Sequence, residues 1–409
     1  MIKTVVIVGD FGCVEGGAIK VAQDTAIILK NAGLDVIYFC CVAPVSKNLI
    51  ENGIKIVCTN QTDILNEKNK IKGVLRGINN KRASKYFKEL LISLNPAETI
   101  IHVHSWTKAV SSSIFKVAKK AGFKVAVTVH DYFLVCPNGA LYNYVKNEIC
   151  TLKPMSFKCK ICNCDARSYP QKLFRLVRQK RQNKNIIKND CVNYIFISEF
   201  SQREFEKRNN KLLDDRKYFL QNPIEIPLNR ERIRCEENSE YLFIGRVTKG
   251  KGIIQFCEAV VKCNVSATVI GDGDLKEQLQ NQYPQVKFVG WKSQKEIGMY
   301  LRKARCLIFP ALWYETFGLV TLETMAYGIP VICTSTCASS DFIQDGKTGF
   351  LCSGNVNSLA ESIEKTKDNE LIKNFSINTF QNFDAKSLCK DSYLKNLIAI
   401  YESILKQYN

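Results

Sequence analysis

The 409-residue sequence lacks any apolar run that approaches the roughly 20 residues of a membrane-spanning helix. It also lacks a recognisable signal peptide, because the apolar stretch from Ile2 to Val8 is short and β-branched and indicates a first core strand instead. Short-period repeats and low-complexity segments are absent as well. We therefore expect a folded protein that stays in the cytoplasm.

Acidic residues are scarce relative to basic ones. The sequence has 39 Asp and Glu against 58 Lys and Arg, which gives a net charge of +19. This excess indicates an anionic partner, and nucleic acid, phosphorylated small molecules and the anionic face of a membrane are the candidates. Hydrophobic residues at 46% and charged residues at 24% are typical of a globular chain, and the length suits two α/β domains.

Eighteen cysteines would indicate disulfides in a small secreted protein, but here most lie within apolar strands, as in Phe39-Cys40-Cys41. A reduced cysteine is a small side chain that packs readily in a core. We expect most of them to be reduced core residues.

Two runs of alternating strands and helices indicate two α/β halves. The first half opens with strand Ile2–Val8, a glycine-rich loop through Gly16-Gly17, a helix that Gly33 ends, and strand Asp35–Cys41; the alternation resumes from Ile100 to Val129. The second half restarts at Tyr241–Ile244 and continues to Pro330–Cys333, and Pro223 marks the break. The pattern predicts an α/β fold of two doubly wound, Rossmann-like parallel sheets facing a cleft, with ligands at the carboxyl ends of the strands.

A glycine-rich basic segment, Gly245-Arg246 to Lys251-Gly252, stands where a strand ends and a helix begins. Glycine lets the backbone approach a ligand closely, and the start of a helix offers free N–H groups to an anion. Arg246 can grip a phosphate with two hydrogen bonds, and Lys251 acts as a point charge. Taken by itself, the segment is explained equally well by an anion-binding site and by a solvated basic turn.

Two glutamates flank a second helix start at Gly318. Glu315 precedes this helix and is expected to project into the cleft, and Glu323 lies on its first turns. An acidic residue near a helix start is commonly only a partner of the helix dipole. That explanation suits either glutamate alone and suits the whole arrangement poorly.

Together these motifs resemble glycosyltransferase family 4, the retaining group 1 glycosyl transferases of surface polysaccharide biosynthesis. The likeness rests on Gly-Arg followed by Lys-Gly, on Glu315 and Glu323 separated by seven residues in Glu-Thr-Phe-Gly-Leu-Val-Thr-Leu-Glu, and on Asp345-Gly346-Lys347-Thr348-Gly349. It is strong over about residues 240–355 and weaker in the first half, where Gly16-Gly17 and Val129-His130-Asp131 carry it.

The resemblance implies a GT-B fold and a division of the chain into an acceptor-side domain over 1–220, a nucleotide-sugar domain over 221–385 and a helix over 386–409 that crosses back. It implies that Arg246 and Lys251 neutralise the leaving diphosphate, that Glu323 holds the ribose and that Glu315 holds the sugar hydroxyls. His130 and Glu315 are the implied catalytic residues. The implied donor-binding residues are Gly16, Gly17, Arg246, Lys251, Phe317, Gly318, Leu319 and Glu323.

The implied reaction is transfer of a sugar, with retention, from a UDP- or GDP-sugar to a glycan acceptor, which we expect to be linked to polyprenyl diphosphate. The family implies no catalytic metal. The product would be a bacterial surface polysaccharide such as O-antigen or capsule. Such an acceptor would bring the enzyme to the inner face of the cytoplasmic membrane, in contact with anionic lipid.

The sequence has only three histidines. His130 ends a strand, and we expect it in the active site, with Asp131 either orienting it or capping the next turn. We expect His104 to line the cleft and His102 to lie in the core on the opposite side of the sheet.

A cysteine-rich, basic insertion at about 132–190 interrupts the first half. Four cysteines that include a C-x-x-C pair are enough for a closed zinc site, and we predict a structural zinc on Cys136, Cys150, Cys159 and Cys162, with Cys164 spare. Free thiols are the alternative. A basic amphipathic helix follows, with apolar residues such as Leu173 and Val177 among eight Lys and Arg residues. It either lies on an anionic membrane or packs its apolar side on the domain and leaves a solvated basic face.

Two other functions remain open. One is a different GT-B-like enzyme, such as a nucleotide-sugar epimerase or a phosphorylase, and an epimerase would need no acceptor. The other is a nucleic-acid-binding protein that uses the cysteine cluster and the basic helix, which would bind with a steep salt dependence. We expect no nucleic-acid partner, because that function leaves the two glutamates and the glycine-rich segment unexplained.

Overall fold

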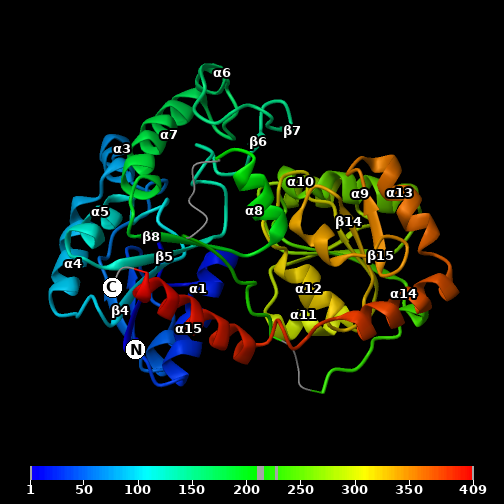
Figure 1. The fold of residues 1–409 in the computed structure, drawn as a ribbon. Coiled ribbons are helices and arrows are strands. Elements are labelled where there is room, and N and C mark those ends of the chain that lie inside the picture. The colour runs from blue at the N-terminus through cyan, green and yellow to red at the C-terminus, as the bar shows by residue number, and fades with distance from the viewer. Residues whose placement is uncertain (1, 210–215, 226–228, 408–409) are drawn as a thin grey trace.

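The computed structural model describes residues 2–209, 216–225 and 229–407, and it contains two parallel sheets side by side (Figure 1). The first sheet has the strand order β3-β2-β1-β4-β5-β8-β9, and the second has the order β12-β11-β10-β13-β14-β15. In each sheet the chain starts at a central strand and the order reverses there, which is the doubly wound arrangement. The predicted fold class of two Rossmann-like domains in the GT-B arrangement is confirmed.

The central strands of the first sheet are almost continuously buried, as expected where helices cover both faces, whereas the edge strands β3 and β9 are partly exposed. They are β1 (Thr4–Val8), β2 (Asp35–Cys40), β3 (Lys55–Cys58), β4 (Thr99–Val103), β5 (Lys124–Val129), β8 (Val192–Phe196) and β9 (Lys217–Phe219). The helices of this half are α1 (Gly17–Asn31), α2 (Lys47–Glu51), α3 (Lys70–Ile78), α4 (Lys81–Ile92), α5 (Ser113–Lys120), α6 (Phe157–Ile161), α7 (Tyr169–Gln182) and α8 (Glu199–Glu206). A two-stranded hairpin of β6 (Tyr142–Asn143) and β7 (Glu148–Ile149) belongs to the insertion.

The second sheet consists of β10 (Glu240–Ile244), β11 (Ala267–Ile270), β12 (Lys287–Gly290), β13 (Ala304–Phe309), β14 (Val331–Thr334) and β15 (Gly349–Cys352). Its helices are α9 (Ile253–Lys262), α10 (Lys276–Gln282), α11 (Gln294–Leu301), α12 (Leu319–Met325), α13 (Val356–Lys365) and α14 (Asn369–Asn382). Ser293 and Glu296 form a capping box at the start of α11. Most predicted boundaries lie within two residues of these.

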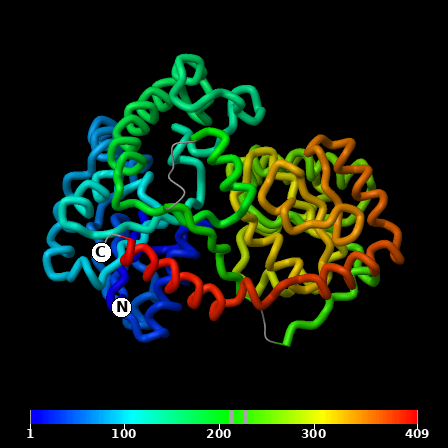
Figure 2. Tube along the Cα trace, viewed as in Figure 1, coloured from blue at the N-terminus to red at the C-terminus, as the bar shows by residue number. Residues whose placement is uncertain are grey.

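The last helix, α15 (Lys390–Lys406), leaves the second domain and runs beneath the first (Figures 1 and 2). Its apolar residues Leu397, Ile400 and Ile404 pack into the same core as residues of β1 and α1. The hydroxyl of Tyr401 lies 2.6 Å from Nδ1 of His102 and forms a hydrogen bond with it, so the helix is also fixed by a buried polar contact. This packing ties the C-terminal end of the second domain to the first domain.

No helix in the described part of the chain is long and apolar enough to cross a membrane. The eighteen cysteines are all free thiols, and twelve of them are buried. Their burial agrees with the prediction that most of them serve as packing residues.

Candidate functional site

The glycine-rich loop after β10 and the loop after β13 meet at the point where the strand order of the second sheet reverses. Gly252 has a positive φ of 72°, and a Cβ atom there would lie 1.9 Å from the carbonyl oxygen of Pro310. A Cβ atom at Gly250 would lie 2.2 Å from the Trp313 ring, and the N–H of Leu312 donates to the carbonyl of Gly250. Only glycine permits this close approach, which brings the two predicted motifs into one site.

Lys251 and Glu315 form an ion pair inside this site. The Nζ of Lys251 lies 2.5 Å from Oε2 of Glu315, and the indole N–H of Trp313 donates to the same oxygen at 2.9 Å. The two side chains are only 13% and 22% exposed. Burial alone would raise the pKa of Glu315, but the charge and hydrogen bond of Lys251, the hydrogen bond from Trp313 and the charge of Arg246 together outweigh it, and the pKa is lowered. Glu315 is therefore ionised and fixes the lysine.

Arg246 differs from Lys251, because its side chain is exposed and forms no hydrogen bond or ion pair with any residue that the structure describes. Its charge nevertheless reaches Glu315, where it contributes to the lowered pKa, and Tyr144, where it opposes the rise in pKa that burial causes. An uncommitted guanidinium beside a held ammonium is suited to receive an anion with two negative charges.

Glu323 lies on α12, which begins after Gly318. Gly318 has a φ of 79°, and a Cβ atom there would lie 2.1 Å from Oγ of Ser339, so the turn requires glycine. Burial raises the pKa of Glu323, and the positive charge of Lys20 on α1 offsets part of this effect. The carboxylate thus faces a cation of the other domain.

The glycine-rich loop of the first domain lies opposite. Gly16 has a φ of 106° and precedes α1. A Cβ atom at Gly17 would be 3.7 Å from Cδ1 of Leu319, which means that the start of α1 faces the start of α12 across the domain boundary. The predicted donor-binding residues of the two domains are therefore brought together.

The three histidines form one cluster, and the prediction that His102 and His104 lie on opposite sides of the sheet is wrong. Their ring centroids are 4.2 Å apart, because residues two positions apart in a strand share a face. His104 Nδ1 lies 3.0 Å from His130 Nε2, and His102 also contacts Thr128. Burial lowers the pKa of His102 and of His130 to about 3, so both imidazoles are neutral at physiological pH.

His130 lies at the boundary between the domains. Its carbonyl accepts a hydrogen bond from Oγ1 of Thr316 at 2.8 Å, and Oγ of Ser198 donates to the carbonyl of Thr316 at 2.6 Å. The residue after Glu315 is therefore held by two elements of the first domain. Asp131 does not orient His130 in a hydrogen bond that the structure describes; it accepts from the N–H of Phe133 at 2.9 Å and caps the next turn.

The insertion reaches the donor-side motif through Tyr144, which sequence reasoning missed. The rings of Tyr144 and Trp313 are 6.2 Å apart in an edge-to-face arrangement. Burial raises the pKa of the Tyr144 hydroxyl to about 12, although Arg246 acts in the opposite direction. The contact spans 169 positions, and an aromatic-rich run, Tyr142-Asn143-Tyr144, was the only signal in the sequence.

Two cysteines of the insertion contact the side chain of Lys172. The fully buried ammonium of Lys172 lies 3.1 Å from Sγ of Cys164 and 3.8 Å from Sγ of Cys159. Within the described ranges, no group of three or more His, Cys, Asp or Glu residues is arranged to hold a metal ion. The arrangement includes Cys164, which the predicted ligand set left out, and a zinc on Cys136, Cys150, Cys159 and Cys162 stays a prediction.

Two Rossmann-like domains that carry paired glycine loops, two cations and two glutamates at facing sheet ends have the form of a GT-B glycosyltransferase. The model of the family described as glycosyl transferases group 1 matches residues 226–381. This part of the chain belongs to that family, and the protein therefore contains a transferase domain.

Curated relatives of similar sequence include glycosyltransferases. An uncharacterized 41.2 kDa protein in the cps region of Klebsiella pneumoniae is 29% identical over 192 residues, which cover 42% of this chain and 51% of the relative. The capsular polysaccharide biosynthesis glycosyltransferase CapM of Staphylococcus aureus is 29% identical over 144 residues, 32% of this chain and 37% of CapM. The chain spans about half the length of the first curated relatives it matches.

Solved structures resemble this chain over nearly its whole length. HepE of Anabaena, in complex with UDP, superposes with a TM-score of 0.69 and covers 98% of this chain and 100% of its own, at 16% sequence identity. At this identity the likeness concerns the fold alone, and it extends to the first domain, which the family model does not match.

Proposed function

We propose that this chain is a retaining glycosyltransferase of family 4 that transfers a sugar from a nucleotide diphosphate sugar to a glycan acceptor. The observation that carries the proposal is the site between the domains, where Lys251 is held by Glu315 beside the uncommitted Arg246 and where Gly17 of the first domain faces Leu319 at the start of α12. A transferase domain of group 1 over residues 226–381 supports it. The binding of UDP and UDP-glucose by the structural neighbour HepE supports a nucleotide-sugar donor.

In this reaction the bond between the anomeric carbon and the diphosphate breaks, and the electron pair leaves with the diphosphate. Arg246 and Lys251 stabilise the negative charge that develops there, so the chain needs no catalytic metal for this role. The acceptor oxygen bonds to the anomeric carbon on the face that the diphosphate leaves, and its proton passes to a phosphate oxygen. The anomeric configuration is thereby retained.

The remaining side chains position the donor. Glu323 accepts hydrogen bonds from the ribose hydroxyls, and the N–H groups of Phe317, Gly318 and Leu319 donate to the sugar or the phosphates. Glu315 accepts from the hydroxyls of the sugar with its second carboxylate oxygen, since Oε2 already receives Lys251 and Trp313. His130 contacts the donor sugar from the first domain as a neutral imidazole.

The acceptor that we propose is a glycan linked to polyprenyl diphosphate, in the assembly of a bacterial surface polysaccharide such as capsule or O-antigen. Relatives whose names refer to a cps region, to capsular polysaccharide and to amylovoran biosynthesis support this process. The enzyme would work in the cytoplasm at the inner face of the membrane, where such acceptors present their glycans.

The test is product analysis with a set of UDP- and GDP-sugars and short glycan acceptors. We expect a new glycosidic bond whose anomeric configuration, read from NMR coupling constants, is that of the donor. Inversion would contradict retention. Conversion of a donor into its epimer without any acceptor would assign the site to an epimerase instead.

A further inference from the structure

Helix α7 of the insertion is packed with its polar side inward. Lys172, Arg178, Gln179 and Gln182 are buried, whereas Leu173 and Val177 are 46% and 54% exposed. The buried groups have partners: Arg178 donates to the carbonyl of Thr107, Gln179 to that of Leu134 and Gln182 to that of Phe133. The domain thus offers carbonyl groups to the polar side of α7, and the alternative in which the apolar side packs on the domain holds only in part. Phe174 packs against Gly77 of α3, whereas Leu173 and Val177 are exposed.

The exposed apolar side of α7 continues onto α6. Tyr169, at the start of α7, lies on the same face as Leu173 and Val177, and its hydroxyl donates to the carbonyl of Lys160 at the end of α6. On α6, Phe157 is 76% and Ile161 is 58% exposed. We call Phe157, Ile161, Tyr169, Leu173 and Val177 the α6–α7 ridge.

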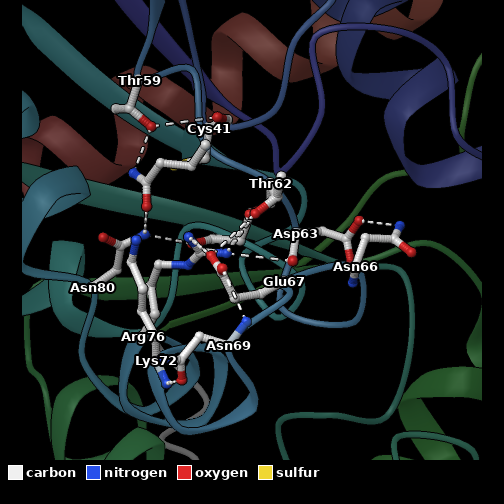
Figure 3. A network of polar contacts seen from close by, with 12 residues as sticks. Cys41, Thr59, Thr62, Asp63, Asn66, Glu67, Asn69, Lys72, Arg76 and Asn80 are labelled. Carbon is white, nitrogen blue, oxygen red and sulfur yellow. Dashed lines mark hydrogen bonds and ion pairs between the residues drawn. The ribbon is translucent and has the colours of Figure 1, made fainter.

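The neighbouring helix α3 repeats this inversion, and Figure 3 shows how its polar side is anchored. Arg76 forms an ion pair with Glu67 at 2.8 Å and donates to the carbonyl of Thr62, while Asn69 caps the N–H of Lys72. The opposite side of α3 exposes Ile71 and Leu75. A Cβ atom at Gly77 would lie 2.6 Å from the ring of Phe174, so α3 packs closely on α7.

These exposed apolar residues are concentrated rather than scattered. Of the fifteen large apolar side chains that are exposed in the described chain, eight lie on α3, α6 and α7. Single exposed apolar residues are ordinary, but a group on adjoining helices marks an interaction surface. The hydrogen bonds and the ion pair on the polar sides of α3 and α7 anchor these two helices on the protein, which fixes the surface in this orientation.

The same helices carry positive charge and no negative charge. Their sequences contain ten Lys and Arg residues and no Asp or Glu. Lys158 and Lys160 alternate with the apolar residues of α6, and Lys180 follows Val177 on the exposed side of α7; all three are exposed. Apolar side chains interleaved with lysines suit a surface that is apolar inside and anionic at its rim.

We propose that the α6–α7 ridge docks on an anionic lipid bilayer, with its five apolar side chains in the boundary between headgroups and acyl chains and the lysines on the lipid phosphates. A protein partner is less well matched, because it would need a groove for the apolar side chains and an acidic residue for each lysine. The inference is independent of the proposed sugar transfer, since it uses none of the donor-site residues.

The α6–α7 ridge lies on the side of the molecule where the insertion contacts the second domain. The hairpin of β6 and β7 lies between the ridge and the second domain (Figure 1), and its Tyr144 contacts Trp313 beside the Lys251–Glu315 pair. A bilayer bound at α6 and α7 would therefore lie on the same side of the molecule as this hairpin. An acceptor anchored in that bilayer could enter without leaving the membrane.

The test is flotation of the purified chain with vesicles of phosphatidylcholine alone and vesicles that also contain phosphatidylglycerol. We expect binding to the anionic vesicles only, because an exposed lysine near such a surface contributes about a fivefold factor in partitioning. Lys158→Glu with Lys160→Glu should weaken partitioning by at least about twentyfold. Leu173→Ser with Val177→Ser should weaken it by about tenfold or more, since each removes half-exposed apolar surface.

Matched controls separate docking from general charge and hydrophobicity. Ile50→Ser with Ile92→Ser removes two apolar side chains elsewhere that are more exposed than Leu173 and Val177, and Lys81→Glu with Lys88→Glu makes the same charge change on α4. Both should bind as the wild type does, and all variants should keep its far-UV circular dichroism. The proposal is overturned if the wild type does not float with anionic vesicles, or if the ridge variants and controls bind alike. A dimer that Leu173→Ser with Val177→Ser dissociates, without vesicle binding, would assign the ridge to a second copy.

Discussion

Replacing Lys251 by methionine tests the ion pair at the centre of the candidate site. The change keeps most of the aliphatic side chain but leaves the carboxylate of Glu315 with the indole N–H of Trp313 as its remaining donor. A fully buried pair that loses one partner costs about 3–5 kcal/mol, and an exposed pair about 0.2–1 kcal/mol. Because Glu315 is 22% exposed, we expect a loss of about 2 kcal/mol, between these two cases.

The loss should appear as a lower melting temperature. For a domain of this size about 1 kcal/mol corresponds to about 2–4 °C, so Lys251→Met should melt about 4–8 °C below the wild type at neutral pH. The added substitution Glu315→Gln should restore part of the difference, since it removes the unpaired charge. UDP should bind to Lys251→Met about tenfold more weakly, because one charge-assisted contact with the diphosphate is lost.

The pH dependence follows from the lowered pKa of Glu315 in the folded wild type. The stability that the pair contributes is present above the ordinary glutamate pKa of about 4.3 and is lost as the pH falls through the folded value. The gap in melting temperature between wild type and Lys251→Met should therefore narrow in acid. Lys249→Met is the control, because Lys249 is exposed in the same turn. Equal melting temperatures and equal UDP affinities for wild type, Lys249→Met and Lys251→Met would refute the reasoning.

Three further predictions concern the other parts of the site. Burial lowers the pKa of His102 and His104 and keeps both neutral in the folded protein. The free energy of unfolding should therefore fall by about 1.4 kcal/mol per pH unit for each of them below pH 6.5. A melting temperature that stays constant from pH 7 to pH 5 would contradict this. Tyr144→Ala should raise the KM for the donor about fivefold while Tyr144→Phe leaves it unchanged, because the ring contact with Trp313 contributes about 1 kcal/mol; a loss of kcat alone would argue against a role in donor binding. The predicted structural metal in the insertion should appear in elemental analysis as about one zinc per chain. The zinc content should be lower in the variant with Cys159→Ser and Cys162→Ser. A metal-free chain with five titratable thiols in the insertion would contradict the prediction.

The second domain could be predicted closely because its strands, helix starts and motifs follow one another at short distances along the chain. The glycine-rich loop after β10 and the loop with Glu315 are each recognisable locally, and the parallel order of strands brings them to the same sheet edge. That Lys251 pairs with Glu315, however, depends on the contact of Gly250 with Trp313, which only the folded structure shows.

The insertion and the helices beside it were harder to predict because they reverse the usual pattern. Helix α3 has two buried glycines and exposed apolar residues, so its periodicity does not indicate a core-facing side, and it was not predicted. Helix α7 was predicted, but its buried Lys172 among cysteine sulfurs was not, since a buried lysine depends on partners far along the chain. The contact of Tyr144 with Trp313 is of the same long-range kind.

The measurement that tests the central claim most directly is nucleotide-sugar binding to wild type, Arg246→Ala and Glu323→Ala. A panel of UDP-, GDP- and ADP-sugars is added to each protein and the melting temperature is followed. We predict that sugars of one nucleotide raise the melting temperature of the wild type, that Arg246→Ala loses this shift through the phosphates, and that Glu323→Ala loses it through the ribose. A wild type that no nucleotide sugar stabilises, or variants that respond as the wild type does, would contradict the claim that this site binds the donor.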